Sequence, residues 1–180
     1  QITKQLATTG YQEVTLLSLS SSDFKQIEPL ASSLSRALEP RRISLKLPSL
    51  RPGTISPILL KAVSRVRTGS LTIAPEAGTE RLRLFIRKDF PDSEIYDSVR
   101  IAFENNWSTI KLYFMVGLPS ETEEDLDGII QLCHNIVAIG REFPGKRNVN
   151  VTLSPFVPKP HTPFQWDSSL PDEEAFRAIQ

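Results

Sequence analysis

The sequence predicts an α/β protein, because strand-like and helix-like segments alternate along its 180 residues. Short runs rich in Val, Ile, Thr and Leu are each followed by a segment whose apolar residues recur three or four positions apart. Most of the runs end in Ser, Gly or Pro, and helix-start residues follow. Five such units in succession favour a parallel sheet with right-handed crossovers. We expect one domain, residues 1–180, that is large enough to bury a core.

The first unit begins with a strand over residues 13–19 (EVTLLSL), which is rich in β-branched and leucine residues. Apolar residues then recur at helical spacing from Phe24 to Leu38. Asp23 and Gln26 stand three residues apart before this helix, as in a capping box.

The second unit has a strand over 42–48 and a helix that begins with Pro57, a residue favoured at the first helical position. The third strand spans 70–74 (SLTIA). A short helix over 80–86 and a longer helix from Asp92 follow it.

The fourth strand spans 109–116, and Thr122 caps the helix that follows. Three acidic residues in the first turn of that helix suit its positive end. The fifth strand covers 149–154, and Pro171 begins a last helix.

Two architectures fit this pattern, a doubly wound sheet and part of a (β/α) barrel. Strands covered by helices on both faces should be almost wholly apolar. Here Lys46 lies within the second strand, while Lys111, Tyr113 and Met115 share one face of the fourth. One face that tolerates polar residues favours a partial (β/α) barrel of five parallel βα units, with an interior that holds a ligand.

The loops after the strands are rich in Ser, Gly and Pro and lie on one rim of either architecture. The most informative is Gly117-Leu118-Pro119, where the fourth strand stops and a helix begins. Such a junction places backbone N–H groups and a helix N-terminus at the carboxyl end of a strand, where α/β proteins bind ligands. The rim loops span 18–23, 48–53, 75–79, 117–121 and 154–164.

Composition excludes some classes of function. Lys and Arg together number 21, as do Asp and Glu, so the formal charge is zero and nucleic-acid binding is disfavoured. No apolar run approaches the roughly 18 residues of a membrane span. The single cysteine, Cys133, favours a reducing, cytoplasmic compartment and rules out a cysteine-ligated cluster within this sequence.

Three segments together resemble the radical S-adenosylmethionine (radical SAM) enzymes. They are Ala74–Leu82 (APEAGTERL), Tyr113–Leu126 (YFMVGLPSETEEDL) and Ser154–Trp166 (SPFVPKPHTPFQW). They are similar, in order and spacing, to the fourth-, fifth- and sixth-strand segments of that superfamily. The nearest resemblance is to uncharacterised Fe–S oxidoreductases that often follow a cobalamin-binding-like domain, and these are related to methylthiotransferases.

The resemblance implies two cofactors, S-adenosylmethionine and a [4Fe–4S] cluster, and reductive cleavage of the first to a 5′-deoxyadenosyl radical. The family holds its cluster on a C-x-x-x-C-x-x-C loop after the first strand, and this sequence has no such loop. The five strands would then correspond to strands 2–6 of the family's open barrel. We expect the first βα unit and the cluster ligands before Gln1, and we expect the fragment alone to be inactive.

The same resemblance assigns S-adenosylmethionine contacts to the strand ends. Ser18 and Ser20 would lie near the methionine amino group. Ser49 and Arg51 follow the next strand, and the guanidinium of Arg51 matches the geometry of the methionine carboxylate.

The remaining contacts would come from the third, fourth and fifth strands. Glu76 would accept bonds from the ribose hydroxyls, with help from Thr79, and Lys111 and Tyr113 would point into the barrel. The residues implied for the two sides of the adenine are Met115, Gly117, Leu118, Phe156 and Val157.

Other features have simpler explanations. The basic residues Arg81, Arg83, Arg87 and Lys88 are expected to form a solvated helix face. A non-catalytic module that binds a small molecule or a partner remains an alternative function. A phosphate-site enzyme is disfavoured, because no loop is a multi-glycine cradle. We also expect self-association, since the strand over 13–19 would have an open edge.

Overall fold

The computed structural model describes residues 5–6, 8–18, 21–48 and 50–169. Its helices are α2 (Ile27–Leu38), α3 (Pro57–Val63), α4 (Glu80–Phe85), α5 (Asp92–Glu104) and α6 (Glu123–Arg141), with 3-10 turns η1 (Ser21–Asp23) and η2 (Glu39–Arg41). Its strands are β1 (Glu13–Thr15), β2 (Ser44–Lys46), β3 (Leu71–Glu76), β4 (Thr109–Val116) and β5 (Asn148–Pro155). The last helix predicted from the sequence, from Pro171, lies outside the described residues.

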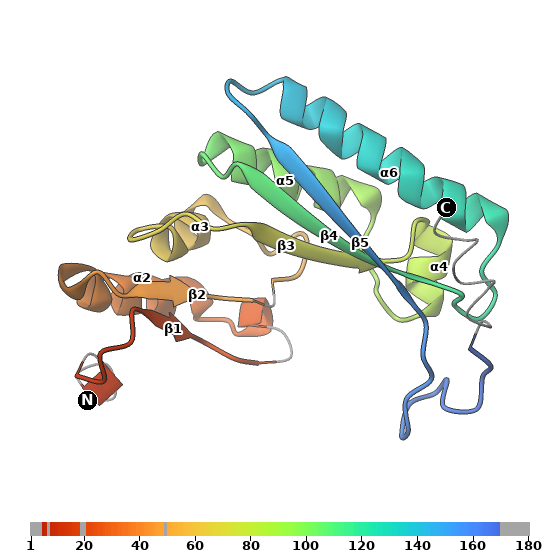
Figure 1. The fold of residues 1–180 in the computed structure, drawn as a ribbon, viewed down its shortest axis with the longest axis horizontal. Coiled ribbons are helices and arrows are strands. Elements are labelled where there is room, and N and C mark those ends of the chain that lie inside the picture. The colour runs from red at the N-terminus through yellow and green to blue at the C-terminus, as the bar shows by residue number, and fades with distance from the viewer. Residues whose placement is uncertain (1–4, 7, 19–20, 49, 170–180) are drawn as a thin grey trace.

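The strands form two parallel sheets, β1-β2 and β3-β4-β5, and within each sheet the spatial order follows the chain order. The arrows run in one general direction, so all strands end toward the same rim (Figure 1). A doubly wound sheet reverses its strand order at a switch point, and the described strands contain no such reversal. The fold is therefore a partial (β/α) barrel, as the sequence predicts.

The two faces of β4 differ in the way that the sequence predicts. Ile110, Leu112, Phe114 and Val116 are at most 1% exposed, because α5 and α6 cover their face. Tyr113, on the opposite face, is 38% exposed. The concave side of the sheet is thus left open, while the convex side carries the core.

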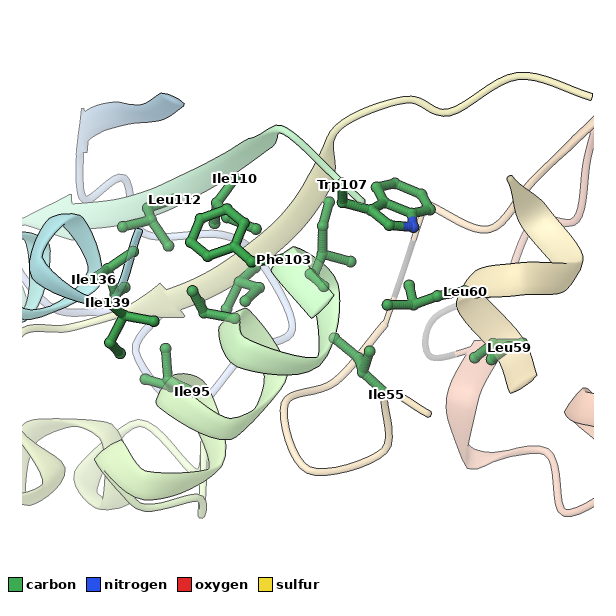
Figure 2. Packing of buried hydrophobic residues seen from close by; sticks show 14 of the residues in the cluster. Ile55, Leu59, Leu60, Ile95, Phe103, Trp107, Ile110, Leu112, Ile136 and Ile139 are labelled. Atoms are coloured by element: carbon green, nitrogen blue, oxygen red, sulfur yellow. The ribbon is translucent and has the colours of Figure 1, made fainter. Parts of the chain in front are cut away.

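The core continues across the gap between the two sheets. Leu59 and Leu60 of α3 are fully buried and belong to the same cluster as Phe103 of α5 and Trp107. Figure 2 shows Phe103 between the α3 side and the Ile136 side of this cluster. The gap itself contains a cavity of about 350 Å³, lined by residues that include Lys46, Lys111 and Trp107.

Two local predictions at the N-terminal end are wrong. The first strand ends at Thr15, since it pairs with β2 over only three residues. The first helix begins at Ile27 without a side-chain cap at Gln26, and Asp23 belongs to η1 instead. The prediction for the second helix is confirmed, because the hydroxyl of Ser56 accepts a bond from the Leu59 N–H at 3.1 Å.

A helix that spans a membrane must be both long and apolar. Among the described helices, none is long and apolar enough to span a membrane.

Candidate functional site

The carboxyl ends of β3, β4 and β5 lie side by side and form the described rim. Parallel pairing continues from Thr109 opposite Asn148 to Val116 opposite Pro155. The N–H of Phe156 then donates to the carbonyl of Val116 at 2.8 Å, which holds the following loop against the end of β4. The turns over residues 75–79 and 117–122 and the loop from residue 156 therefore share one edge of the sheet.

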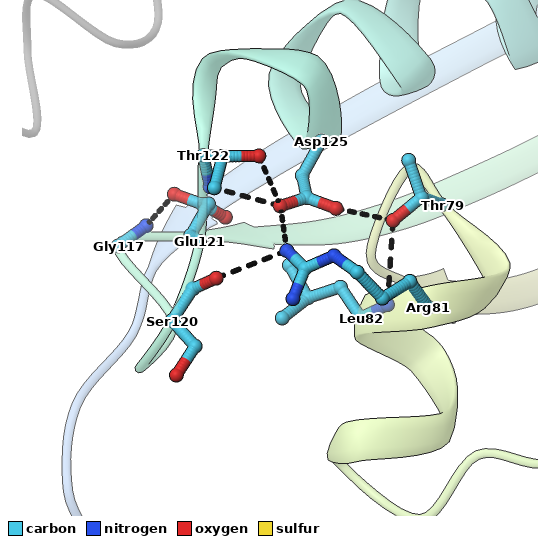
Figure 3. Close-up of polar contacts among 8 residues, drawn as sticks. All are labelled: Thr79, Arg81, Leu82, Gly117, Ser120, Glu121, Thr122 and Asp125. Carbon is cyan, nitrogen blue, oxygen red and sulfur yellow. Dashed lines mark hydrogen bonds and ion pairs between the residues drawn. The ribbon is translucent and has the colours of Figure 1, made fainter.

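A buried carboxylate joins two of these turns. Asp125 is 1% exposed and accepts bonds from the hydroxyl of Thr79, from Arg81, and from both the N–H and the hydroxyl of Thr122. The two Thr122 bonds measure 2.8 Å. Figure 3 shows how these bonds tie the start of α4 to the start of α6.

The hydrogen bonds of Asp125 control its ionisation. Burial by itself raises the pKa of this carboxyl, but the bonds from Thr79, Thr122 and Arg81 outweigh burial and hold the pKa below its usual value. Asp125 is therefore a fixed anion at neutral pH.

The turn after β3 touches the first turns of α6 closely. A Cβ atom on Gly78 would lie 2.1 Å from the carbonyl oxygen of Asp125 and 2.3 Å from the amide nitrogen of Ile129. These are backbone atoms, so no side-chain rotation could make room. Only glycine allows this approach, which explains its place in the APEAGTE segment.

The junction at the end of β4 is closed by a carboxylate. Gly117 has a φ of 80°, and its N–H donates to the carboxylate of Glu121 at 2.6 Å. Burial raises the pKa of Glu121, and bonds from the backbone of Gly117 and Leu118 oppose that effect in part. Gly117, Leu118 and Glu121 line a cavity of about 250 Å³ together with Asp167.

Beside this junction lies a set of apolar side chains from all three turns, here called the rim apolar cluster. Phe164 meets Phe156 edge-on with ring centroids 6.1 Å apart, and it stacks on Phe85 at 5.5 Å. Phe156 is consequently only 7% exposed. The cluster consists of Ala77, Leu82, Ile86, Met115, Leu118, Phe156 and Phe164.

Glu76 is the last residue of β3 and has a φ of 68°. Its carboxylate pairs with the ammonium group of Lys88 at 3.1 Å, and the same ammonium group donates to the carbonyl of Ala74 at 2.8 Å. Both side chains remain partly exposed, at 25% for Glu76 and 34% for Lys88. An acid–base pair therefore stands at the edge of the concave face.

The residues predicted from the sequence separate into two groups. Met115, Gly117, Leu118 and Phe156 lie together at the rim. Thr79 lies near them, but its hydroxyl caps α4 by accepting the Leu82 N–H and also donates to Asp125. Its observed bonds are therefore structural.

The second group does not belong to the rim apolar cluster. The hydroxyl of Ser18 is bonded to that of Ser21 at 3.0 Å, and Arg51 donates to the carbonyl of Asp89 at 2.5 Å. Lys111 lines the cavity between the sheets, and Val157 is 60% exposed. Tyr113 lies on the open face of β4, while Ser20 and Ser49 lie outside the described residues.

The basic run in and after α4 was predicted to be a solvated face, and for Arg83 this prediction is wrong. Its side chain is 0% exposed and donates to the carbonyls of Ala77 and Phe90 at 3.1 and 3.3 Å, and to Asp92. The run of basic residues in the sequence does not indicate that one of them is buried. Asp125 was also missed, although its place three residues after Thr122 is that of a capping-box residue.

The described residues contain no group of three or more His, Cys, Asp and Glu side chains that could hold a metal ion. Cys133 lies in α6 against the core, where burial raises the pKa of its thiol. This part of the chain therefore does not fit a [4Fe–4S] cluster, whose ligands are cysteine thiolates.

The chain is similar in sequence to a curated protein and in fold to a solved structure. No family model matches the chain. It is 36% identical over 153 residues to the uncharacterized protein MJ0966 of Methanocaldococcus jannaschii, and the match covers 85% of this chain and 32% of that protein. The chain thus spans about a third of this relative's length.

A solved structure that resembles the chain is that of the radical S-adenosylmethionine methyltransferase TsrM from Kitasatospora setae, with cobalamin and a [4Fe–4S] cluster bound. The TM-score is 0.65, over 91% of this chain and 31% of that one. The sequence identity is 13%, so the likeness shows a shared fold.

Proposed function

We propose that the chain is the S-adenosylmethionine-binding part of a radical SAM iron–sulfur enzyme. The observation that carries this proposal is the meeting of Met115, Leu118 and Phe156 at one rim. They come from two of the segments that resemble the superfamily, and they adjoin a partial barrel with the fold of a radical SAM methyltransferase.

The rim suits the adenosine half of S-adenosylmethionine. An adenine ring needs an apolar wall and backbone groups that it can approach, and the rim apolar cluster and Gly117 offer both. Phe164 now meets Phe156 edge-on, so an adenine stacked on Phe156 would take the place of Phe164. The Glu76–Lys88 pair supplies an acceptor and a donor for ribose hydroxyls.

The iron–sulfur cluster would supply the electron that cleaves S-adenosylmethionine. We place its ligands elsewhere in a longer protein, since Cys133 is the single cysteine of this sequence. It follows that the 180 residues alone would be inactive. Oxidoreductase chemistry and a cytoplasmic location belong to the same proposal.

The test uses the full-length protein, purified without oxygen. We expect an iron-to-protein ratio near four in the absence of further clusters, binding of S-adenosylmethionine in equilibrium dialysis, and 5′-deoxyadenosine after reduction with dithionite. A loaded cluster without either binding or cleavage would reject the proposal. Binding of S-adenosylmethionine without any cluster would instead support the non-catalytic binding module.

Two substitutions locate the site. Phe156→Leu keeps an apolar side chain at the rim but removes the ring, and base–aromatic stacking contributes about 1–3 kcal/mol. We therefore expect about tenfold weaker binding of S-adenosylmethionine. Trp166→Leu is the matched control, because Trp166 is 90% exposed and should leave the affinity unchanged. If both variants bound S-adenosylmethionine with equal affinity, Phe156 would not be part of the binding site.

A further inference from the structure

A third cavity lies between the loop after β2 and the connection from α4 to α5. Its volume is about 370 Å³, within the range of small-molecule sites. Arg51 and Leu50 line it from the loop, Arg87 and Lys88 from the connection, and Thr72 from the concave face of β3. None of its lining residues belongs to the rim apolar cluster.

The cavity has an excess of positive charge. Arg51, Arg87 and Lys88 line it with Asp23 as the single carboxylate, although the chain as a whole is neutral. Lys88 is already paired with Glu76. Lys88 uses two of its three N–H donors on Glu76 and Ala74, so the two arginines have the most donors left for a ligand.

The donors of the two arginines are largely unused in the described structure. Arg51 donates one Nη2 bond to the carbonyl of Asp89. Arg87 is exposed and has no side-chain hydrogen bond or ion pair with any described residue. A guanidinium carries five N–H donors in a planar fork that matches the oxygens of phosphate and carboxylate.

Arg87 has a left-handed backbone conformation, which is unfavourable for arginine. Its φ is 63°, its N–H donates to the carbonyl of Leu84 at 3.1 Å, and the N–H of Lys88 donates to the carbonyl of Arg83 at 2.8 Å. This is the Schellman ending of a helix, where glycine is the usual residue in the left-handed position. An arginine at this position lowers stability, so its backbone does not explain its presence.

The connection that bears Arg87 is held from both sides. The buried guanidinium of Arg83, on α4, bonds to the carbonyl of Phe90 near the end of the connection and to the carbonyl of Ala77 in the turn before α4. Arg51, from the loop after β2, donates to the carbonyl of Asp89 in the connection. Arg87 is therefore presented on a fixed backbone, which reduces the entropy lost on binding.

We propose that this cavity binds the phosphate or carboxylate group of a small molecule through Arg51 and Arg87. A phosphate monoester carries close to two negative charges at neutral pH and should bind more tightly than a carboxylate. Because Thr72 and Ala74 lie on the concave face, the rest of the ligand would extend over that face. Arg51 would then contact this ligand instead of the methionine carboxylate implied by the sequence resemblance.

The test measures binding of inorganic phosphate and of acetate to the full-length protein, by ³¹P and ¹³C NMR line broadening at constant ionic strength and without S-adenosylmethionine. Phosphate should bind measurably and more tightly than acetate. Tighter binding of acetate would assign the site to carboxylates, and no binding of either anion would overturn the proposal.

Arg87→Gly separates a functional role from a structural one. Loss of one charge-assisted contact at an exposed site should weaken phosphate binding about fivefold to tenfold. The same change should raise the melting temperature, by about 2 °C, since glycine suits the left-handed position. A purely structural arginine would give the stability gain without the loss of binding, and that result would refute the proposal.

Arg42→Gly is the matched control. Arg42 is also exposed and left-handed, with a φ of 55°, but it lies at the end of η2 and lines none of the cavities described above. It should gain stability in the same way and keep the phosphate affinity. An equal loss of affinity in both variants would show a general charge effect and would also refute a site at Arg87.

Discussion

Asp125 is predicted to stabilise the junction between the starts of α4 and α6, and Asp125→Ala tests this. The substitution removes the acceptor of four hydrogen bonds at the junction of α4 and α6. Loss of the Thr122 cap should cost about 1 kcal/mol, and loss of the Thr79 bond to a buried charge about 1.5 kcal/mol. Arg81 is 53% exposed, so its ion pair adds less than about 1 kcal/mol.

The expected loss in the free energy of unfolding is therefore about 3 kcal/mol. Urea unfolding followed by circular dichroism measures it, with the slope of the transition compared between variants. Asp127→Ala is the control on the same helix, since Asp127 is exposed and should cost less than about 0.5 kcal/mol. Equal losses for the two variants would refute the reasoning that the junction depends on Asp125.

The other predictions concern pH, packing and charge at the same rim. Because the pKa of Asp125 is lowered on folding, its stabilisation is complete above the unfolded value, about pH 4, and is lost as the pH falls through the folded value. The difference in unfolding free energy between Asp125→Asn and the unaltered protein should thus be constant above about pH 4 and shrink as the pH falls further; a difference that stays constant at low pH would contradict this. Gly78→Ala should cost about 3 kcal/mol or more, because the new Cβ meets backbone. Gly69→Ala is the control, because a Cβ at Gly69 would have no other atom within 4 Å, and it should hardly change the free energy of unfolding in urea. Equal losses for the two variants would count against the packing argument. Arg83→Met should cost about 3–5 kcal/mol, because it leaves buried carbonyls without donors. A loss below about 1 kcal/mol on urea unfolding would show that these carbonyls find other partners.

Features determined by neighbours along the chain could be predicted from the sequence. The alternation within β4 and the Pro57 helix start are local, so their patterns remain visible in one dimension. The place of Gly117 at a strand end follows in the same way. These patterns suffice for an α/β fold with one open face and a rim rich in turn residues.

Features determined by contacts between distant elements could not be predicted. The short β1 results from its three-residue pairing with β2, and the break between β2 and β3 depends on how two sheets sit on one core. Arg83 looked like one basic residue among four. Arg83 is buried because the chain folds back so that the carbonyl of Phe90 meets its guanidinium. The spacing of residues in the sequence does not indicate this contact.

The sequence by itself therefore determined the strand and helix succession, the open concave face and the residues of the rim. Only the tertiary structure decided which of those residues have free polar groups. Thr79 is already bonded to Asp125, and Glu76 to Lys88. Arg87, which the sequence did not place at the rim, lines a cavity without a side-chain partner among the described residues. The physical reason is that hydrogen bonds between turns depend on distances across the rim, and those distances arise only when the strands have paired.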